Sequence, residues 1–355
     1  MTAVWNGSGQ KDFEMKYYLA PLEGITGCIF RNTLREVFGD VDKCFTPFIA
    51  PNENRPMNMR ERTDVLPEHN EGIFLVPQIL TNRADHFLTT ARELAEMGYE
   101  EINLNLGCPS GTVAAKKRGA GFLSEPEKLE AFLEEIYNKC PVQISIKTRL
   151  GIYEPEEFYE ILEIYKKFPV SELIIHPRVQ KDFYKNKPRM EVFRQAAARS
   201  TFPVCYNGDL FSVSDIEEFR KSFPDIDCAM IGRGALKNPA IFRMLQLCEE
   251  NFEDRKISKR APEDREMPKG APDAEELRCF HDLLVERYYE RMADDRNVLF
   301  KMKELWSYLI YSFKDAEKYG KKIRKAQKLA DYREVVRQLF AECPVTVSKE
   351  VNWNA

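Results

Sequence analysis

The segment 101–148 reads EINLNLGCPSGTVAAKKRGAGFLSEPEKLEAFLEEIYNKCPVQISIKT, and it predicts a strand, a helix and a second strand. The two strands are short apolar runs, Glu101–Asn105 and Gln143–Thr148. Between them Pro126–Lys139 has a helical period and follows Ser124-Glu-Pro, a helix start signal with proline in the first turn. Two strands joined through a helix pair in parallel.

The same unit recurs along the chain on both sides of this segment. Further amphipathic helices are predicted at Arg83–Met97, Pro155–Lys167 and Val213–Ser222. The predicted strands are Tyr17–Ala20, Lys43–Ile49, Ile73–Ile79, Glu101–Asn105, Gln143–Thr148, Glu172–His176, Pro203–Asn207 and Asp227–Gly232. Eight strands alternating with helices favour an α/β fold, a (β/α)₈ TIM barrel. An open doubly wound sheet is the alternative, but no GxGxxG follows the first strand.

The pattern also predicts the domain boundaries. Residues 1–14 precede the barrel pattern and are expected to form a flexible tail, and the barrel is expected to span 15–253. Residues 254–276 hold three prolines and thirteen charges without an apolar period, which indicates a charged linker. Residues 277–345 are helical in pattern throughout and predict a smaller all-helical domain, with 346–355 as a C-terminal tail.

Composition excludes several classes of protein. At 43% hydrophobic residues the chain can bury a large core, and no apolar stretch reaches the roughly 18 residues that span a bilayer. The first residues lack a secretory signal, so a soluble cytoplasmic protein without membrane contact is expected. The nine cysteines are odd in number and form no CxxC pair, so neither disulfides nor a metal site is expected. Most of these cysteines are expected to be buried small hydrophobes.

Charge is unevenly distributed along the chain. The net charge is −4, yet residues 301–340 carry eleven Lys or Arg against five Asp or Glu. A basic segment on an acidic body is typical of phosphate binding, although a solvated helix face gives the same pattern.

In a TIM barrel the functional side chains lie where strands end. The residues at the predicted strand ends are Pro21, Gln78, Asn105 with Cys108, Lys147, His176 with Arg178, Asn207 with Gly208, and Gly232 with Arg233. Solvated loops also supply polar residues, but lysine and histidine closing apolar strands are less common by chance.

The run NLGCPSGTVAAKKRGAGFL, 105–123, is the most specific motif. Gly107 and Pro109 form a constrained turn that holds Cys108 at the barrel mouth. A thiol held there can donate a proton to a carbon centre or act as a nucleophile. The alternative is a cysteine that only packs. Gly119 and Gly121 are expected to let the following loop lie close to a ligand.

Six segments resemble the dihydrouridine synthase family (FMN-dependent, bacterial type) in order and spacing. They are YLAPLEGITGCIFR (18–31), INLNLGCPSGTV (102–113), ISIKTRLG (144–151), IIHPR (174–178), CYNGD (205–209) and MIGRGALKNPAIF (230–242). The resemblance runs from about residue 15 to 340, and the helical region from His281 resembles that family's RNA-binding domain.

The resemblance implies a flavin mononucleotide (FMN) at the barrel mouth. Pro21 and Gln78 would contact its ring, and Lys147 would place a cation near the N1–O2 edge. The phosphate would be held by Asn207, Gly208, Asp209, Gly232 and Arg233. His176 is assigned either to the flavin ring or to the substrate.

The resemblance also implies an RNA substrate. Asn105 and Arg178 would face the target uracil or its backbone. The tRNA would be bound by the basic residues of the helical domain, Lys321, Lys322, Arg324 and Lys325. Pro177 stands where the family usually has glycine, and the 181–187 loop lacks the usual glycine after its tyrosine, so the preferred uridine does not follow from the resemblance.

The implied reaction is the reduction of uridine in tRNA to 5,6-dihydrouridine. NADPH would reduce FMN, the reduced flavin would give hydride to uracil C6, and Cys108 would protonate C5, with no metal required. Two alternatives remain open from the sequence. One is a flavin barrel acting on a free pyrimidine, as dihydroorotate dehydrogenases do, and the other is a non-catalytic RNA-binding module.

Overall fold

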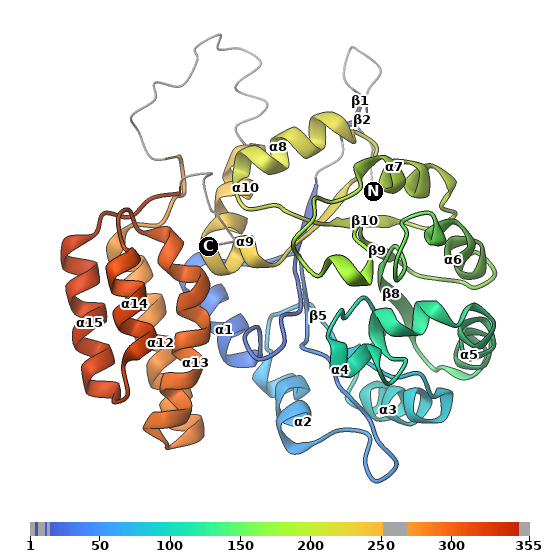
Figure 1. The fold of residues 1–355 in the computed structure, drawn as a ribbon, viewed down its shortest axis with the longest axis horizontal. Coiled ribbons are helices and arrows are strands. Elements are labelled where there is room, and N and C mark those ends of the chain that lie inside the picture. Colours follow the sequence, from blue (N-terminus) through green and yellow to red (C-terminus); the bar gives the residue numbers. More distant parts are fainter. Residues whose placement is uncertain (1–3, 6–10, 13–14, 251–267, 348–355) are drawn as a thin grey trace.

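The computed structural model describes residues 4–5, 11–12, 15–250 and 268–347 (Figure 1). Nine parallel strands form a ring with eight positions, because the consecutive short strands β5 and β6 together occupy one position. The strands are β3 (Lys16–Leu19), β4 (Lys43–Phe45), β5 (Leu75–Val76), β6 (Gln78–Ile79), β7 (Glu101–Leu106), β8 (Gln143–Arg149), β9 (Leu173–His176), β10 (Val204–Asn207) and β11 (Cys228–Ile231). Their hydrogen-bonded order is β5–β4–β3–β11–β10–β9–β8–β7–β6, and every pair is parallel. The predicted (β/α)₈ barrel is confirmed.

Prolines explain where the strands differ from the prediction. The predicted strand Ile73–Ile79 is divided at Pro77, which has no N–H to donate. β5 therefore pairs with β4 and β6 with β7, and this change of partner closes the ring. The strand predicted over Lys43–Ile49 ends at Phe45, because Pro47 interrupts it, and Ile49 keeps only an isolated bridge to Ile79.

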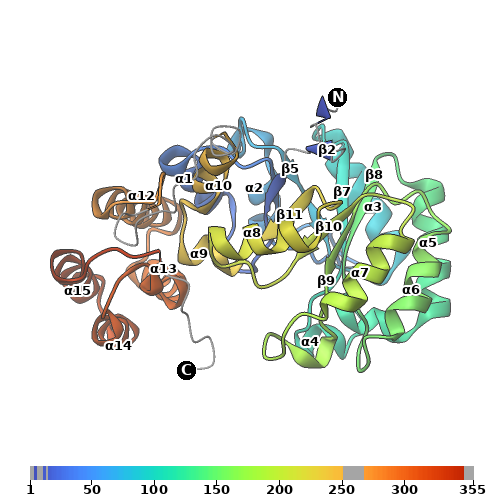
Figure 2. The same cartoon turned by 90° about the horizontal axis from the view of Figure 1, so that it is seen from above.

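The helices surround the ring and pack their apolar faces against it (Figures 1 and 2). They are α1 (Cys28–Phe38), α2 (Met59–Val65), α3 (Ala84–Glu96), α4 (Gly111–Ala114), α5 (Pro126–Lys139), α6 (Glu157–Tyr165), α7 (Met190–Arg199), α8 (Val213–Ser222), α9 (Arg233–Lys237) and α10 (Ile241–Glu250). Helices α5 and α8 have the predicted bounds.

The barrel interior is apolar at depth and polar at one end. Its apolar part is a separate cluster made of Tyr18, Ala20, Phe45, Val76, Ile174, Cys205, Cys228 and Met230. At the amino ends of the strands, Lys43 is paired with Glu101 and Glu172 at 3.0 and 3.4 Å. The interior is filled, so a ligand has access only at the carboxyl ends.

Within residues 268–347, four α-helices follow the barrel: α12 (Ala274–Met292), α13 (Asp295–Leu309), α14 (Glu317–Lys325) and α15 (Leu329–Glu342). Helix α12 begins three residues before the predicted Leu277, because Asp273 and Glu276 form a capping box. Phe280 packs against the rings of Phe30 and Phe38 of α1, which joins the helices to the barrel (Figure 1).

Other expectations concern the ends of the chain and the thiols. Residues 4–5 and 11–12 form an antiparallel pair, β1 (Val4–Trp5) and β2 (Lys11–Asp12), outside the barrel sheet. The rest of the expected tail, the first part of the linker and residues 348–355 lie outside the described residues. None of the nine cysteines is in a disulfide bond, and only four are buried, fewer than expected. Within the described ranges, no helix has the length and apolar character that crossing a membrane would require.

Gly234 in α9 provides a test of the packing between α9 and the loop after β10. A methyl group at this position would lie 2.2 Å from the carbonyl oxygen of Leu210. We expect Gly234→Ala to reduce the free energy of unfolding by roughly 1–3 kcal/mol, since overpacking moves backbone. Gly111→Ala is the matched control, because the added methyl would meet nothing within 4 Å. Equal melting temperatures for the two variants would contradict the packing described.

Candidate active site at the barrel mouth

One pocket opens at the carboxyl ends of the strands and brings most of the predicted site together. Its lining includes ten predicted residues: Pro21, Gln78, Asn105, Cys108, Lys147, His176, Asn207, Gly208, Gly232 and Arg233. Two further predicted residues, Arg178 and Asp209, are not in the lining but contact residues that are. The four basic residues of α14 lie elsewhere.

A chain of side-chain amides crosses the pocket floor. Asn103 donates to Ser145 Oγ at 2.9 Å, and Gln78 Nε2 donates to Asn103 Oδ1 at 2.8 Å. Asn105 Nδ2 then donates to Gln78 Oε1 at 2.7 Å. These side chains are buried, and each donor or acceptor left unpaired there would cost about 1–3 kcal/mol. The amide orientations are therefore determined by their neighbours.

Asn105 also holds the cysteine turn. Its Oδ1 accepts hydrogen bonds from the backbone N–H groups of Gly107 and Cys108, at 3.0 and 2.9 Å. The Cys108 carbonyl accepts from Ala120 N at 3.1 Å. Burial raises the pKa of the Cys108 thiol above its ordinary value. The pocket therefore presents a protonated thiol at neutral pH, suited to donate a proton rather than to attack as a thiolate.

Gly119 and Gly121 lie where the chain packs closely. Neither lines the pocket. Gly119 has φ +55°, and a Cβ there would lie 2.9 Å from both Cβ and O of Cys108. A Cβ on Gly121 would lie 2.6 Å from the Ala114 backbone. These glycines let the chain pack closely, Gly119 against Cys108 and Gly121 against Ala114 of α4, while their approach to a ligand stays a prediction.

Cationic groups line the pocket beside the cysteine turn, on the neighbouring strand β8. The Lys147 side chain makes no hydrogen bond or ion pair with another described residue. Desolvation is the main cause that lowers its pKa to about 8, and the nearby positive charge of Arg149 is the second cause. Arg149 donates to the carbonyl oxygens of Gly107 and Val179, both at 3.0 Å, and burial lowers its pKa to about 10. The half-buried Lys147 ammonium is thus a cation without an anion, which an electron-rich ligand edge would stabilise.

His176 is held neutral in a defined tautomer. Burial and the neighbouring cations, above all Arg149, lower its pKa well below its ordinary value. Arg178 Nη1 lies 3.0 Å from His176 Nε2. A guanidinium can only donate, so Nε2 accepts and the ring proton is on Nδ1. His176 therefore offers a donor on its other nitrogen.

Asp209 is a bridge between two arginines. It accepts from Arg178 Nη1 and Nη2 at 2.9 and 2.5 Å and from Arg233 Nη2 at 2.7 Å. Arg178 is 1% exposed and also donates to the Asn186 carbonyl at 2.5 Å. Its guanidinium donors are directed to protein groups, while Asp209 orients the guanidinium of Arg233 at the pocket wall.

Several residues of the pocket were not predicted from the sequence. Arg149 was missed because β8 runs one residue past the predicted end at Thr148. Tyr184 comes from the 181–187 loop and lies over the guanidinium groups of Arg233 and Arg149, at 4.7 and 5.4 Å. No local signal distinguishes Tyr184 from other loop tyrosines, although its neighbours Lys181 and Lys187 are basic. Asn103 alternates with Asn105 on β7, and this period is a signal that could have found it.

The basic cluster on α14 consists of Lys321, Lys322, Arg324 and Lys325, all exposed. The helix buries Tyr319 and Ile323 instead. None of the four forms an ion pair with another described residue, and Lys322 lies over the Tyr319 ring at 5.4 Å. In Figure 2, α14 and α4 both lie toward the lower side of the view, α14 among the helices on the left and α4, which follows β7 at the barrel mouth, under the barrel on the right.

The fold and the pocket define a TIM-barrel enzyme whose site combines a protonated thiol with a cluster of cations. Residues 18–344 match the family model described as "Dihydrouridine synthase (Dus)". The chain belongs to the dihydrouridine synthase family. It is an oxidoreductase that reduces uridine to dihydrouridine.

Two relatives found by sequence support this assignment. The chain is 27% identical to a tRNA-dihydrouridine(16) synthase of Vibrio parahaemolyticus over 65% of this chain and 74% of that protein. It is 30% identical to a probable tRNA-dihydrouridine synthase of Staphylococcus aureus, over 64% of this chain and 70% of that one. Among solved structures, morphinone reductase aligns with 65% of this chain and 85% of its own, at 11% identity and a TM-score of 0.47.

The unpaired Lys147 gives a pH-dependent prediction for the ligand-free protein. Its pKa is about 8 in the folded state and 10.5 ordinarily, so between these values the unfolded chain binds more protons and stability rises with pH. We expect Lys147→Met to remove this dependence and, after discounting for solvent screening, to add roughly 1–2 kcal/mol at pH 7. Urea unfolding from pH 7 to 11 measures both effects, with the exposed Lys185→Met as control. A lower free energy of unfolding for Lys147→Met than for the parental protein at pH 7 would contradict the interpretation of Lys147 as an unpaired charge.

Proposed function

We propose that this chain is a tRNA-dihydrouridine synthase that binds FMN at the barrel mouth and uses NADPH as reductant. The observation that carries the proposal is the pocket itself, in which the protonated Cys108 and the unpaired Lys147 cation are combined. The named activity of the similar proteins, synthesis of dihydrouridine in tRNA, supports tRNA as the substrate. Because tRNA is made and used in the cytoplasm of a bacterial cell, we place the protein there.

The residues present fit FMN. Lys147 would pair with the ring edge on which negative charge gathers, and Gln78 has one amide N–H left after its bond to Asn103. At the other end, Gly208 and Gly232 line the pocket without side chains, beside the Arg233 guanidinium oriented by Asp209. Backbone N–H groups and a guanidinium are the groups that bind a phosphate dianion, and this end follows strands seven and eight of the barrel.

The chain's own residues would direct the reduction. When bound, FMN would supply the hydride that adds to C6 of the target uracil. Cys108 would deliver the proton to C5, because its raised pKa keeps the thiol protonated. Asn105 would set the position of Cys108 through the two backbone N–H groups it holds. His176 Nδ1–H would donate to a carbonyl oxygen of the flavin or the uracil.

Arg178 would act as a positioning residue. Its donors are directed to His176, Asp209 and the Asn186 carbonyl, so it would determine the tautomer of His176 and the orientation of Asp209. The target base would have to leave its stack in folded RNA to enter the pocket, as other base-modifying enzymes require. Tyr184, 48% exposed at the pocket rim, offers a ring on which the base can stack.

The helical domain favours RNA over a free pyrimidine. Lys301 of α13 donates to the carbonyl oxygen of Gly24 at 2.5 Å, in the loop that continues from Pro21. The helical domain contacts the active-site loop and carries the basic cluster on α14. A large anionic substrate accounts for both features, whereas a small substrate accounts for neither.

Cys108→Ala separates the two half-reactions. We expect NADPH to reduce the bound flavin at the parental rate, whereas dihydrouridine formation falls by about 10²–10⁴-fold, since only the second step needs the proton. Stopped-flow absorbance follows the first step, and mass spectrometry of digested tRNA follows the second. Mapping the modified position tests position 16 first, the number in the names of several relatives. Parental dihydrouridine formation by the variant would show that Cys108 is structural.

Neutralising the basic cluster tests RNA binding. We expect glutamine at Lys321, Lys322, Arg324 and Lys325 to weaken tRNA binding and to reduce the slope of log K against log salt by about 0.7–0.9 for each phosphate that the variant no longer neutralises. Flavin reduction by NADPH should not change. The control removes the same number of positive charges from lysines of the outer barrel surface. It places glutamine at Lys128 and Lys139 of α5 and at Lys166 and Lys167 after α6, each of which is paired with a glutamate. Equal effects in both variants would mean that the α14 cluster is only a solvated face.

A further inference from the structure

A second pocket lies next to the active site, between the barrel and the helical domain. Its apolar lining comes from Ile25, Pro47, Phe48, Tyr288 and Met292, and it encloses about 120 Å³. Two of these residues, Pro47 and Phe48, also line the active-site pocket. The two pockets therefore share a wall in the loop after β4.

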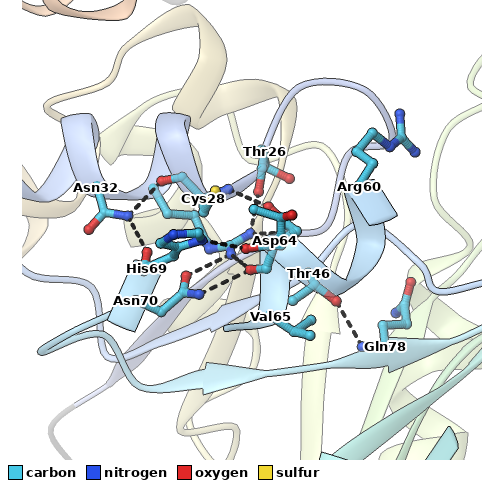
Figure 3. Close-up of polar contacts among 12 residues, drawn as sticks. Thr26, Cys28, Asn32, Thr46, Arg60, Asp64, Val65, His69, Asn70 and Gln78 are labelled. Atoms are coloured by element: carbon cyan, nitrogen blue, oxygen red, sulfur yellow. Dashed lines mark hydrogen bonds and ion pairs between the residues drawn. The ribbon is translucent and has the colours of Figure 1, made fainter. Parts of the chain in front are cut away.

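The two acidic residues that line this pocket, Asp64 and Glu61, accept hydrogen bonds from other groups of the protein. Asp64 accepts from the Cys28 backbone N–H at 2.5 Å and from Arg31 at 3.2 Å. Glu61 accepts from the backbone N–H groups of Ala50 and Asn58, at 3.1 and 2.7 Å. Figure 3 shows Asp64 within its network, with the Arg60 side chain extending away from it. Asp64 is thus paired with a cation, and both oxygens of Glu61 accept backbone hydrogen bonds.

The cations of the pocket are less fully paired. Arg291, exposed in the last turn of α12, makes no hydrogen bond or ion pair with another described residue. Lys301 contacts the Gly24 carbonyl and lies 4.0 Å from Glu304. Arg60 is paired with Glu23 at 2.6 Å, but both side chains are well exposed, so this pair is weak. The pocket thus combines an apolar, aromatic floor with a positively charged rim.

We propose that this pocket binds the base of a nucleotide adjoining the target uridine, with its phosphate on Arg291. The proposal rests on the proposed function. Unpaired RNA bases are recognised by stacking on aromatic side chains, while arginine contacts the backbone phosphate. Because the pockets share Pro47 and Phe48, an RNA strand that places one base in the active site passes the second pocket.

Size and location favour an RNA base over the nicotinamide reductant. A closed cavity of about 150 Å³ holds benzene. The second pocket, at about 120 Å³, is smaller but open, so one planar ring can enter it only with part of the ring left outside, and a dinucleotide does not fit. One wall is made by Tyr288, Arg291 and Met292 of α12. This helix belongs to the domain that carries the basic cluster, whereas a small reductant needs no second domain.

The test removes the base from the RNA and fills the pocket in the protein. The substrates are a tRNA with its mapped target uridine and two versions of it, each with an abasic nucleotide on one side of the target. The variants are Met292→Trp, which fills the pocket, Arg291→Gln, and the control Arg333→Gln on the distant helix α15. The measured quantities are kcat and KM for dihydrouridine formation, the rate of flavin reduction by NADPH, and the melting temperature.

We expect one abasic tRNA to lose about ten-fold in kcat/KM with the parental protein, the order of one base–aromatic stack. With Met292→Trp, intact and abasic tRNA should react equally slowly. Arg291→Gln should raise KM for tRNA and reduce its salt slope by about one, while Arg333→Gln should not. The proposal fails if neither abasic tRNA differs from intact tRNA. It fails equally if Arg291→Gln instead raises KM for NADPH, which would assign the pocket to the reductant. If instead the parental protein forms no dihydrouridine in intact tRNA, the proposed function itself is wrong.

Discussion

The carboxamide of Asn105 is the interaction on which the geometry of the site depends. Its oxygen holds the backbone of Cys108, and its nitrogen donates to Gln78, which in turn donates to Asn103. One buried amide chain thus connects the proposed proton donor with the proposed flavin contact across two strands, β7 and β6. Since every member is buried, removal of one leaves others unpaired, and the chain behaves as a unit rather than as separate contacts.

A second feature is the direct attachment of the helical domain to the active-site loop. Phe280 packs on α1, and Lys301 donates to the Gly24 carbonyl, a few residues after Pro21. Gly24 has φ +81°, and a Cβ there would lie 3.1 Å from the Glu304 carboxylate, so α13 and this loop are closely fitted. The domain proposed to hold RNA is therefore packed against the loop that supplies Pro21, Leu22 and Glu23 to the wall of the catalytic pocket.

The site was predictable where function lies at a strand end. Lys147, His176 and Cys108 each close or follow an apolar strand, and the barrel rule places all such ends at one mouth. Residues whose part depends on contacts from distant segments were not accessible in this way. Arg178 is predicted at the mouth, yet its donors are directed to His176, Asp209 and a loop carbonyl. Tyr184 reaches the pocket only because its loop folds back over it.

By itself the sequence determined the order of strands and helices, because alternating apolar periods and proline signals act locally along the chain. It also determined the cysteine turn, since Gly107 and Pro109 constrain the backbone around Cys108. Only the tertiary structure decided which of these groups are charged, paired or unpaired. The low pKa of Lys147 and the neutral tautomer of His176 come from burial and from cations on other strands. Desolvation and through-space charge depend on the packed arrangement, which no local pattern contains.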